Sequence, residues 1–222
     1  MVGIVDYNAG NITSVEHALR RLGTDFLLSG SAAELGGCDR LIFPGVGEAS
    51  YAMEQLRYSG LDGFLREWAS AGRPLLGICL GSQIIFDWSE EGNVRCLGLL
   101  GGKIRRFDSC AGFLKHTPAP DDACASRNSN HAQELKIPHI GWNDIHRLNG
   151  GTPLLEGIPD GSDFYFVHSY VICPDDPSVV RAAAEYGVAV PAVIQCGNIF
   201  ACQFHPEKSG EKGLRILENF CR

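Results

Sequence analysis

Residues 72–86 read GRPLLGICLGSQIIF, and this stretch predicts a buried strand, a tight turn and a helix. Cys79 occupies the turn, with glycines two positions before it and two positions after it. Because Gly77 and Gly81 carry no side chain, strand and helix can approach closely around a strained turn residue. The free N–H groups and the dipole at the start of the helix stabilise a thiolate. The pattern therefore makes Cys79 a candidate nucleophile.

The sequence around this turn indicates an α/β fold. Short apolar runs alternate with segments of helical periodicity, with strands predicted at residues 2–7, 26–28, 41–43 and 75–78, and helices at 12–22, 31–34 and 61–68. Such alternation is typical of a parallel sheet with helices on both faces. We therefore expect an open, flavodoxin-like, mostly parallel sheet. Ligands of such sheets bind at the carboxyl ends of the strands, where Cys79 and residues 44–47 both fall.

The second half of the chain has a different pattern. A strand is predicted at residues 163–170, a hairpin at 190–204 and a final helix at 210–222. These segments predict an antiparallel strand extension within a single domain spanning residues 1–222. Residues 108–134 lack periodicity and are rich in turn-forming residues, so a mobile surface loop is predicted there.

The composition argues against several classes of protein. The 222 residues carry a net charge of −7 and no dense basic run, so no nucleic-acid partner is predicted. The nine cysteines include no C-x-x-C pair, so neither a disulfide framework nor a metal site is predicted. The chain opens without the pattern of a signal peptide, and no apolar run reaches the ~18 residues of a membrane span. We expect a cytoplasmic protein that uses no metal or cofactor and binds no membrane.

A nucleophilic thiol needs a base, and His205 and Glu207 are predicted to form it. They lie two residues apart after an apolar strand, so in extended backbone both side chains would project to one side. The carboxylate can then bind one imidazole nitrogen and leave the other for the thiol of Cys79. This is the nucleophile, base and orienter of a catalytic triad. In α/β-hydrolases the acid precedes the histidine, so that fold fits poorly.

An oxyanion hole is predicted at residues 45–47, where Gly-Val-Gly follows a buried strand and offers backbone N–H groups. The rival interpretation is a dinucleotide-binding fingerprint. Residues 45–50 lack its third glycine and do not follow the first strand, so nicotinamide binding is not predicted.

Together these segments resemble the class I (triad) glutamine amidotransferases. Residues 77–81 with Gln83, and residues 205–207, match motifs shared across that class. Within the class, further segments resemble the glutaminase subunits of imidazole glycerol phosphate synthase: residues 6–11 (DYNAGN), 44–47 (PGVG), 138–143 (PHIGWN), 165–170 (YFVHSY) and 203–209 (QFHPEKS). The resemblance covers the chain from residue 2 to about residue 220, apart from 108–134.

The resemblance implies a reaction. Cys79 would attack the side-chain amide of L-glutamine, and His205, held by Glu207, would donate a proton to the leaving ammonia. Hydrolysis of the thioester would release glutamate. The ammonia would be channelled to a cyclase subunit, a (β/α)8 barrel, which makes imidazole glycerol phosphate and aminoimidazole carboxamide ribotide in histidine biosynthesis. The two subunits would form a heterodimer.

The resemblance also implies further site residues: Val46, Gly47 and Leu80 for the oxyanion hole, Gln83, His168, Ser169 and Tyr170 for substrate binding, and Asn11, Trp142, Tyr165 and Lys208 for the partner interface. The chain departs from the family pattern at Asn8, where glycine is usual, at Ala49, where an aromatic residue is frequent, and at Ser82, where methionine is usual. Asparagine tolerates left-handed backbone, so the turn at Asn8 is expected to survive.

Two alternatives stay open at this point. A paralogous glutaminase could supply ammonia to another synthase or to cell-surface sugar amidation. A non-enzymatic sensing module could use a reactive cysteine without turnover. The pair of His205 and Glu207 argues against the second alternative, because sensing needs no general acid.

Overall fold

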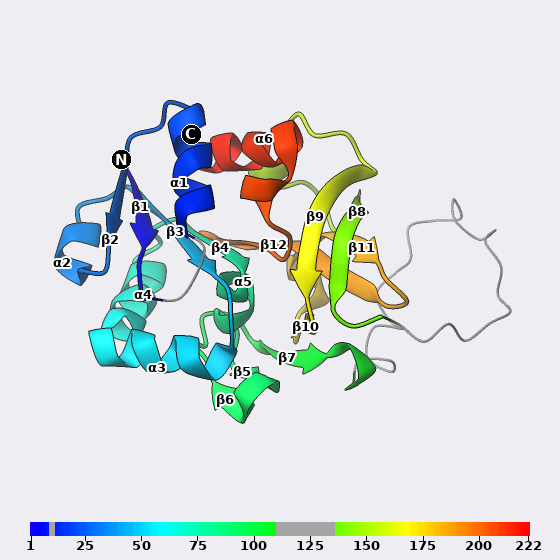
Figure 1. Ribbon diagram of the computed structural model, residues 1–222, viewed down its shortest axis with the longest axis horizontal. Helices are drawn as coiled ribbons and strands as arrows, with labels where there is room; N and C mark the ends of the chain where they lie inside the picture. The colour runs from blue at the N-terminus through cyan, green and yellow to red at the C-terminus, as the bar shows by residue number, and fades with distance from the viewer. Residues whose placement is uncertain (9–11, 110–135) are drawn as a thin grey trace, which may run out of the picture.

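The computed structural model describes residues 1–8, 12–109 and 136–222, and its central element is a nine-stranded sheet in the order β2-β1-β3-β4-β13-β12-β11-β8-β9 (Figure 1). Five strands run parallel: β1 (Val2–Val5), β2 (Phe26–Ser29), β3 (Arg40–Gly45), β4 (Leu75–Cys79) and β13 (Ile199–Cys202). Four continue the sheet in antiparallel fashion: β12 (Ala189–Cys196), β11 (Val180–Glu185), β8 (His139–Arg147) and β9 (Ser162–His168). The predicted fold class, a parallel sheet with an antiparallel extension, is confirmed.

Helices cover both faces of the parallel strands. In Figure 1, α1 (Ile12–Arg21) and α6 (Gly210–Cys221) lie above the sheet, whereas α3 (Ala49–Ser59) and α4 (Leu61–Ser70) lie below it. The short helices are α2 (Ala32–Leu35) and α5 (Leu80–Ile84). Ile42 packs into the core that contains α1 and α6, and its neighbours Leu41 and Phe43 pack into the opposite core. Because successive side chains of a strand point to opposite faces, β3 is buried on both sides and reads as a continuous apolar run.

A second sheet of four strands, in the order β10-β7-β5-β6, was not predicted. It contains β10 (Tyr170–Pro174), β7 (Gly102–Arg106), β5 (Trp88–Ser89) and β6 (Val94–Arg95). The predicted strand at residues 163–170 is therefore confirmed up to His168 and wrong at its end, because Tyr170 begins a different strand. In β9 the buried residues alternate and end at His168, whereas in β10 four consecutive residues are buried. This change of pattern marks the place where the chain leaves one sheet and enters the other, at Ser169.

The predicted surface loop at residues 108–134 is described only at its start. Asp108 and Ser109 end a short 3₁₀ helix, Phe107–Ser109, and residues 110–134 lie outside the described residues, as does Asn11. Within the described ranges, no helix has the length and hydropathy needed to cross a bilayer.

Candidate active site

The turn at Cys79 joins β4 directly to α5. Cys79 has φ +53°, a left-handed conformation that is rare for a residue with a side chain. A Cβ on Gly81 would overlap the carbonyl oxygen of Phe43, and one on Gly77 would lie 2.8 Å from the carbonyl oxygen of Gly81. The two glycines are therefore required by close backbone contacts, as the sequence predicted. Ser82 donates a hydrogen bond of 2.5 Å to the carbonyl oxygen of Cys79, which braces the strained residue from within the helix.

His205 and Glu207 form the predicted pair. The Nδ1 atom of His205 lies 2.7 Å from Oε1 of Glu207, and the two side chains are only 2% and 3% exposed. Extended backbone was predicted between the two residues, and this was wrong: residues Pro206–Lys208 form a 3₁₀ turn. Proline after His205 begins this turn, and the turn brings the carboxylate back to the ring.

Two further hydrogen bonds attach this turn to β9. The backbone N–H of His205 donates to the carbonyl oxygen of Tyr165 at 2.9 Å. The hydroxyl of Ser209 donates to the carbonyl oxygen of His205 at 2.6 Å and accepts from the backbone N–H of Tyr165 at 3.0 Å. The backbone of β9 therefore fixes the position of the histidine.

The environment of His205 favours its protonated form. Burial alone would lower the pKa of the imidazole, but hydrogen bonding with Cys79 and Glu207, together with their negative charges, raises the pKa to about 10. Nε2 of His205 is buried and, among the described residues, it interacts with Cys79 without a hydrogen bond of normal geometry. The Cys79 thiol thus lies beside the ring in charge contact, and its Sγ is 3.8 Å from the carbonyl oxygen of Val167. A thiol that interacts with a protonated imidazole has the composition of an activated nucleophile with a cationic acid.

A cavity of about 390 Å³ opens beside Cys79. Its lining contains most of the residues that the resemblance implied: Val46, Gly47, Cys79, Leu80, Gln83, His168, Ser169, Tyr170, His205 and Lys208. Lys208, expected at the partner interface, therefore also faces the cavity. Glu207 is absent from the lining and acts on the cavity only through His205.

The predicted oxyanion segment lies next to Cys79, because Gly45 is the register partner of Cys79 between β3 and β4. Gly47 has φ +96°, a conformation that suits glycine, and Val46 is 36% exposed. A Cβ on Gly45 would lie 2.5 Å from the hydroxyl of Tyr7, so this position also requires glycine.

The substrate-binding candidates do not all present free side chains to the cavity. The amide nitrogen of Gln83 donates to the carbonyl oxygen of Tyr170 at 3.2 Å and to Oε1 of Gln203 at 2.9 Å. The ring of His168 is bonded on both nitrogens, to the carbonyl oxygen of Tyr170 and to His139. These side chains hold the cavity wall together.

Sequence reasoning missed two residues. Glu91 is the acidic side chain in the cavity lining, and it accepts a hydrogen bond of 3.0 Å from the backbone N–H of Ala49. Burial raises the pKa of this carboxyl group. Tyr7 places a buried hydroxyl near Cys79, and burial, followed by the charge of Cys79, raises the pKa of the phenol. Tyr7 belongs to the segment at residues 6–11 that resembles the family, whereas no local sequence pattern relates Glu91 to the cavity.

The turn at Asn8 keeps the conformation that glycine would adopt. Asn8 has φ +59°, and its backbone N–H donates to Oδ1 of Asp6 at 3.1 Å. The expectation that asparagine preserves this turn is confirmed.

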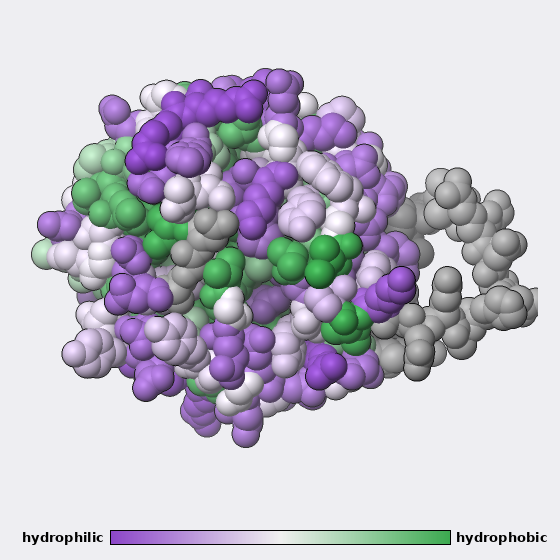
Figure 2. Space-filling view, in the orientation of Figure 1, coloured by the Kyte–Doolittle hydropathy of each residue, from purple (hydrophilic) through white to green (hydrophobic). Residues whose placement is uncertain are grey.

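The interface candidates Trp142 and Tyr165 form a cross-strand pair on β8 and β9, with ring centroids 6.1 Å apart. Trp142 is 59% exposed and Ile140, on the same side of β8, is 58% exposed. Figure 2 shows apolar surface gathered over these two strands. This β8–β9 patch, consisting of Ile140, Trp142, Tyr165 and Val167, borders the cavity through Val167.

Within residues 1–8, 12–109 and 136–222, no group of three or more His, Cys, Asp or Glu side chains is placed to hold a metal ion.

Comparisons with known proteins agree with this geometry. The family model for glutamine amidotransferase class-I matches residues 3–222. The imidazole glycerol phosphate synthase subunit HisH of Geobacillus thermodenitrificans (strain NG80-2) is 44% identical over 221 residues, covering 99% of this chain and 94% of the relative. The subunit of the same name from Geobacillus kaustophilus (strain HTA426) is 46% identical over 221 residues, covering 99% and 95%. A solved glutamine amidotransferase structure superposes with a TM-score of 0.69 at 21% identity, covering 99% of this chain and 98% of the other, a likeness of fold alone.

Proposed function

Since this chain belongs to the class-I glutamine amidotransferase family, we propose that it hydrolyses L-glutamine at Cys79 as the glutaminase subunit of an imidazole glycerol phosphate synthase. That enzyme belongs to histidine biosynthesis. The observation that carries the proposed site is the convergence of Cys79, His205 and Glu207, which are distant in sequence, beside one cavity.

The mechanism begins with a thiolate and an imidazolium. Sγ of Cys79 attacks the side-chain carbonyl carbon of glutamine, and the carbonyl electrons move to oxygen. Backbone N–H groups at Gly47 and Leu80 are the proposed donors to this oxyanion. When the intermediate collapses, the C–N bond breaks, and Nε2–H of His205 gives its proton to the departing nitrogen, which leaves as ammonia.

The second half of the reaction hydrolyses the thioester. His205, now neutral, takes a proton from water as the water oxygen attacks the carbonyl carbon. The C–S bond then breaks, glutamate leaves, and the thiolate and imidazolium are restored. Glu207 stays charged and keeps Nδ1 of His205 as the donor, so that only Nε2 exchanges protons.

The charges in the cavity suit an amino acid. Glu91 places a carboxylate in the lining, and one of its oxygens already accepts from Ala49. We assign the remaining oxygen to the α-ammonium group of glutamine. The neutral side-chain amide of the same glutamine molecule would then point toward Cys79.

The β8–β9 patch is the proposed docking surface for the cyclase subunit. A (β/α)8 barrel seated on Trp142 and Tyr165 would bury the exposed Trp142 and cover the half-buried Tyr165, and aromatic residues are enriched in such interfaces. Tyr165 also accepts the backbone hydrogen bond of His205, so the docking surface lies one peptide group from the catalytic turn. Ammonia released beside Cys79 would enter the partner across this surface.

The proposal is tested by measuring glutamate formation from glutamine with the chain alone, with a cyclase subunit, and with the cyclase and its nucleotide ligand. We expect strong stimulation by the complete mixture and no activity in Cys79→Ala. Retained hydrolysis in Cys79→Ala refutes the triad assignment. Stimulation by a different ammonia-dependent synthase, and not by the cyclase, refutes the assigned partner.

A further inference from the structure

A pair of buried histidines lies directly behind the cavity wall. His139 on β8 and His168 on β9 are register partners, so their side chains point to the same face of the two strands. Both are almost fully buried, at 2% and 6% exposure. The ring of His139 is stacked between Phe166 and Tyr186, with centroid distances of 4.7 Å and 4.0 Å. His168 lines the cavity and His139 does not.

The hydrogen bonds of this pair have only one consistent direction. Nδ1 of His168 lies 2.7 Å from the carbonyl oxygen of Tyr170, and a carbonyl only accepts, so Nδ1 of His168 carries the proton. In a neutral ring Nε2 of His168 is then an acceptor. Nδ1 of His139, 3.0 Å from it, must therefore be the donor.

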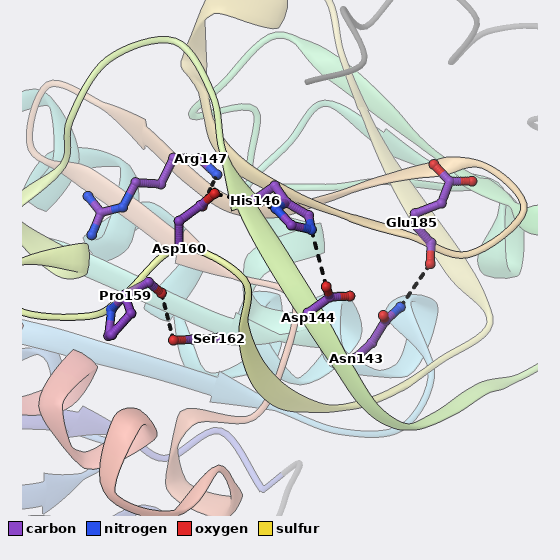
Figure 3. A network of polar contacts seen from close by, with 8 residues as sticks. All are labelled: Asn143, Asp144, His146, Arg147, Pro159, Asp160, Ser162 and Glu185. Carbon is purple, nitrogen blue, oxygen red and sulfur yellow. Dashed lines mark hydrogen bonds and ion pairs between the residues drawn. The ribbon is translucent and has the colours of Figure 1, made fainter. Parts of the chain in front are cut away.

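The series of hydrogen bonds continues from His139 to Asn143 and from there to β11. The Nδ2 atom of Asn143 lies 3.3 Å from Nε2 of His139 and 3.0 Å from the carbonyl oxygen of Glu185 on β11, the contact drawn in Figure 3. Both of these neighbours accept, and an amide nitrogen has two hydrogens to donate. The opposite amide orientation would place an oxygen against two acceptors. In the hydrogen-bonded series that runs from the carbonyl oxygen of Glu185 to that of Tyr170, each group thus has a fixed role as donor or acceptor.

Electrostatics agrees with neutral rings throughout. Burial lowers the pKa of His139 to about 4. Burial lowers the pKa of His168 to about 3; the hydrogen bond to Tyr170 opposes this shift, and the charges of His139 and His205 add to it. At neutral pH neither ring carries the additional proton that would set two donors against each other.

This hydrogen-bonded series ends at the wall of the cavity beside Cys79. Tyr170, whose carbonyl oxygen accepts from His168, also accepts from Gln83 in the cavity wall. On the other side of His168, the carbonyl oxygen of Val167 faces Sγ of Cys79. Because the chain passes from one sheet to the other at Ser169, this short segment needs a side-chain hydrogen bond to fix its course.

We infer that His139 is a positioning residue for the glutamine pocket: its Nδ1–H donates to Nε2 of His168 and holds that ring in place, and His168 in turn holds the wall formed by residues 167–170 through its bond to the carbonyl oxygen of Tyr170. The inference rests on the proposed glutamine pocket. His139 itself touches no substrate.

Two substitutions separate the hydrogen bond from the packing. His139→Phe keeps a ring between Phe166 and Tyr186 and removes the donor. His139→Asn loses the stacking and keeps an amide donor near the position of Nδ1. With the cyclase subunit and its nucleotide ligand present, we expect His139→Phe to raise KM for glutamine roughly tenfold with a smaller change in kcat, the effect of one lost buried hydrogen bond. We expect His139→Asn to recover most of the affinity although it unfolds at lower denaturant.

His146→Phe is the matched control, because His146 lies on the same strand, is 40% exposed in its side chain and contacts Asp144 and Asp160 on the other side of the sheet (Figure 3). It should leave KM unchanged. A KM that follows the order of stability, with His139→Asn worse than His139→Phe, overturns the inference. Glutamine hydrolysis by the wild-type complex is measured first, so failure of the proposed function is recognised separately.

A measurement on the unmutated protein needs no activity. Imidazole ¹⁵N chemical shifts at pH 7 should show His139 and His168 both protonated at Nδ1 and unprotonated at Nε2. A proton on Nε2 of His168 overturns the inference, even if both variants fold poorly. In His139→Phe we expect His168 to keep its proton on Nδ1, because the carbonyl oxygen of Tyr170 still requires it, and the shift of its Nε2 to move to that of an acceptor without a donor.

Discussion

Replacing Glu207 by glutamine is expected to destabilise the fold most at pH 6 and progressively less toward pH 10. The pKa of His205 is about 10 in the folded chain and 6.5 as the reference value. This difference is worth roughly 5 kcal/mol at 1.36 kcal/mol per unit. Glu207 and Cys79 both raise the pKa, so we assign about half, or 2–3 kcal/mol, to Glu207, in the range of hydrogen bonds to charged groups.

The sign follows from proton binding. Because the folded pKa exceeds the unfolded pKa, the folded state holds the proton more tightly. The stabilisation is complete below the unfolded pKa of 6.5 and is lost as the pH rises toward 10. In Glu207→Gln the charge that holds the proton is gone, and burial then favours a neutral ring. The variant should therefore approach the wild type in stability at high pH.

The assay is urea unfolding of wild type and Glu207→Gln at several values between pH 6 and pH 10. Glu211→Gln is the control, because the Glu211 side chain is 94% exposed and should change stability little at any pH. A loss of stability that is constant with pH, or that grows as the pH rises, would refute the assignment of a protonated His205. The protonation state is checked independently from the ¹⁵N shifts of His205.

Three other substitutions test separate parts of the site. Gly81→Ala should lower the free energy of unfolding by about 3 kcal/mol or more, because its Cβ overlaps the Phe43 carbonyl. The control is Gly63→Ala on α4, whose Cβ meets open space and which should stabilise the fold by about 0.5–1 kcal/mol. A similar effect of both substitutions in urea unfolding contradicts the close-contact explanation. Ser82→Ala removes the brace on Cys79 and should cost about 1 kcal/mol with a lower kcat; an unchanged kcat shows that the brace does not position the thiol. Trp142→Ala should weaken cyclase binding at least roughly tenfold in titration calorimetry, while glutamine hydrolysis by the isolated subunit stays the same.

The part of the candidate site whose arrangement could be predicted from sequence depends on local geometry. The turn at Cys79 follows from residues within a few positions of it, and its two glycines meet the backbone contacts that such a turn creates. The contact between His205 and Glu207 follows from their spacing, even though a 3₁₀ turn, rather than extended chain, produces it. Their meeting with Cys79 was proposed because each segment follows a strand, and the structure shows that these strands, β4 and β13, are parallel neighbours.

What the sequence could not supply depends on strand register and on a second sheet. His139 and His168 become partners only through the pairing of β8 with β9, and nothing near either residue states that register. Glu91 reaches the cavity because the small sheet of β5, β6, β7 and β10 places it beside Gln83 and Tyr170. The apolar pattern of residues 163–170 continues through the junction of the sheets, so periodicity alone could not locate it.

The two faces of β9 would let one strand serve both the proposed partner and the pocket. Side chains of a strand alternate between its two faces. Tyr165 and Val167 therefore lie on the face of the patch, and Phe166 and His168 lie on the buried face with His139. The backbone between them is shared, and the carbonyl oxygen of Tyr165 is also the acceptor that fixes His205. On the proposed docking, a partner that shifts Tyr165 through its side chain would also shift this acceptor, and the wall held by His168 would move with the same strand. On the proposed docking, binding at the patch and chemistry at Cys79 would be joined by the backbone of β9 and by Val167, which belongs to the patch and lines the cavity.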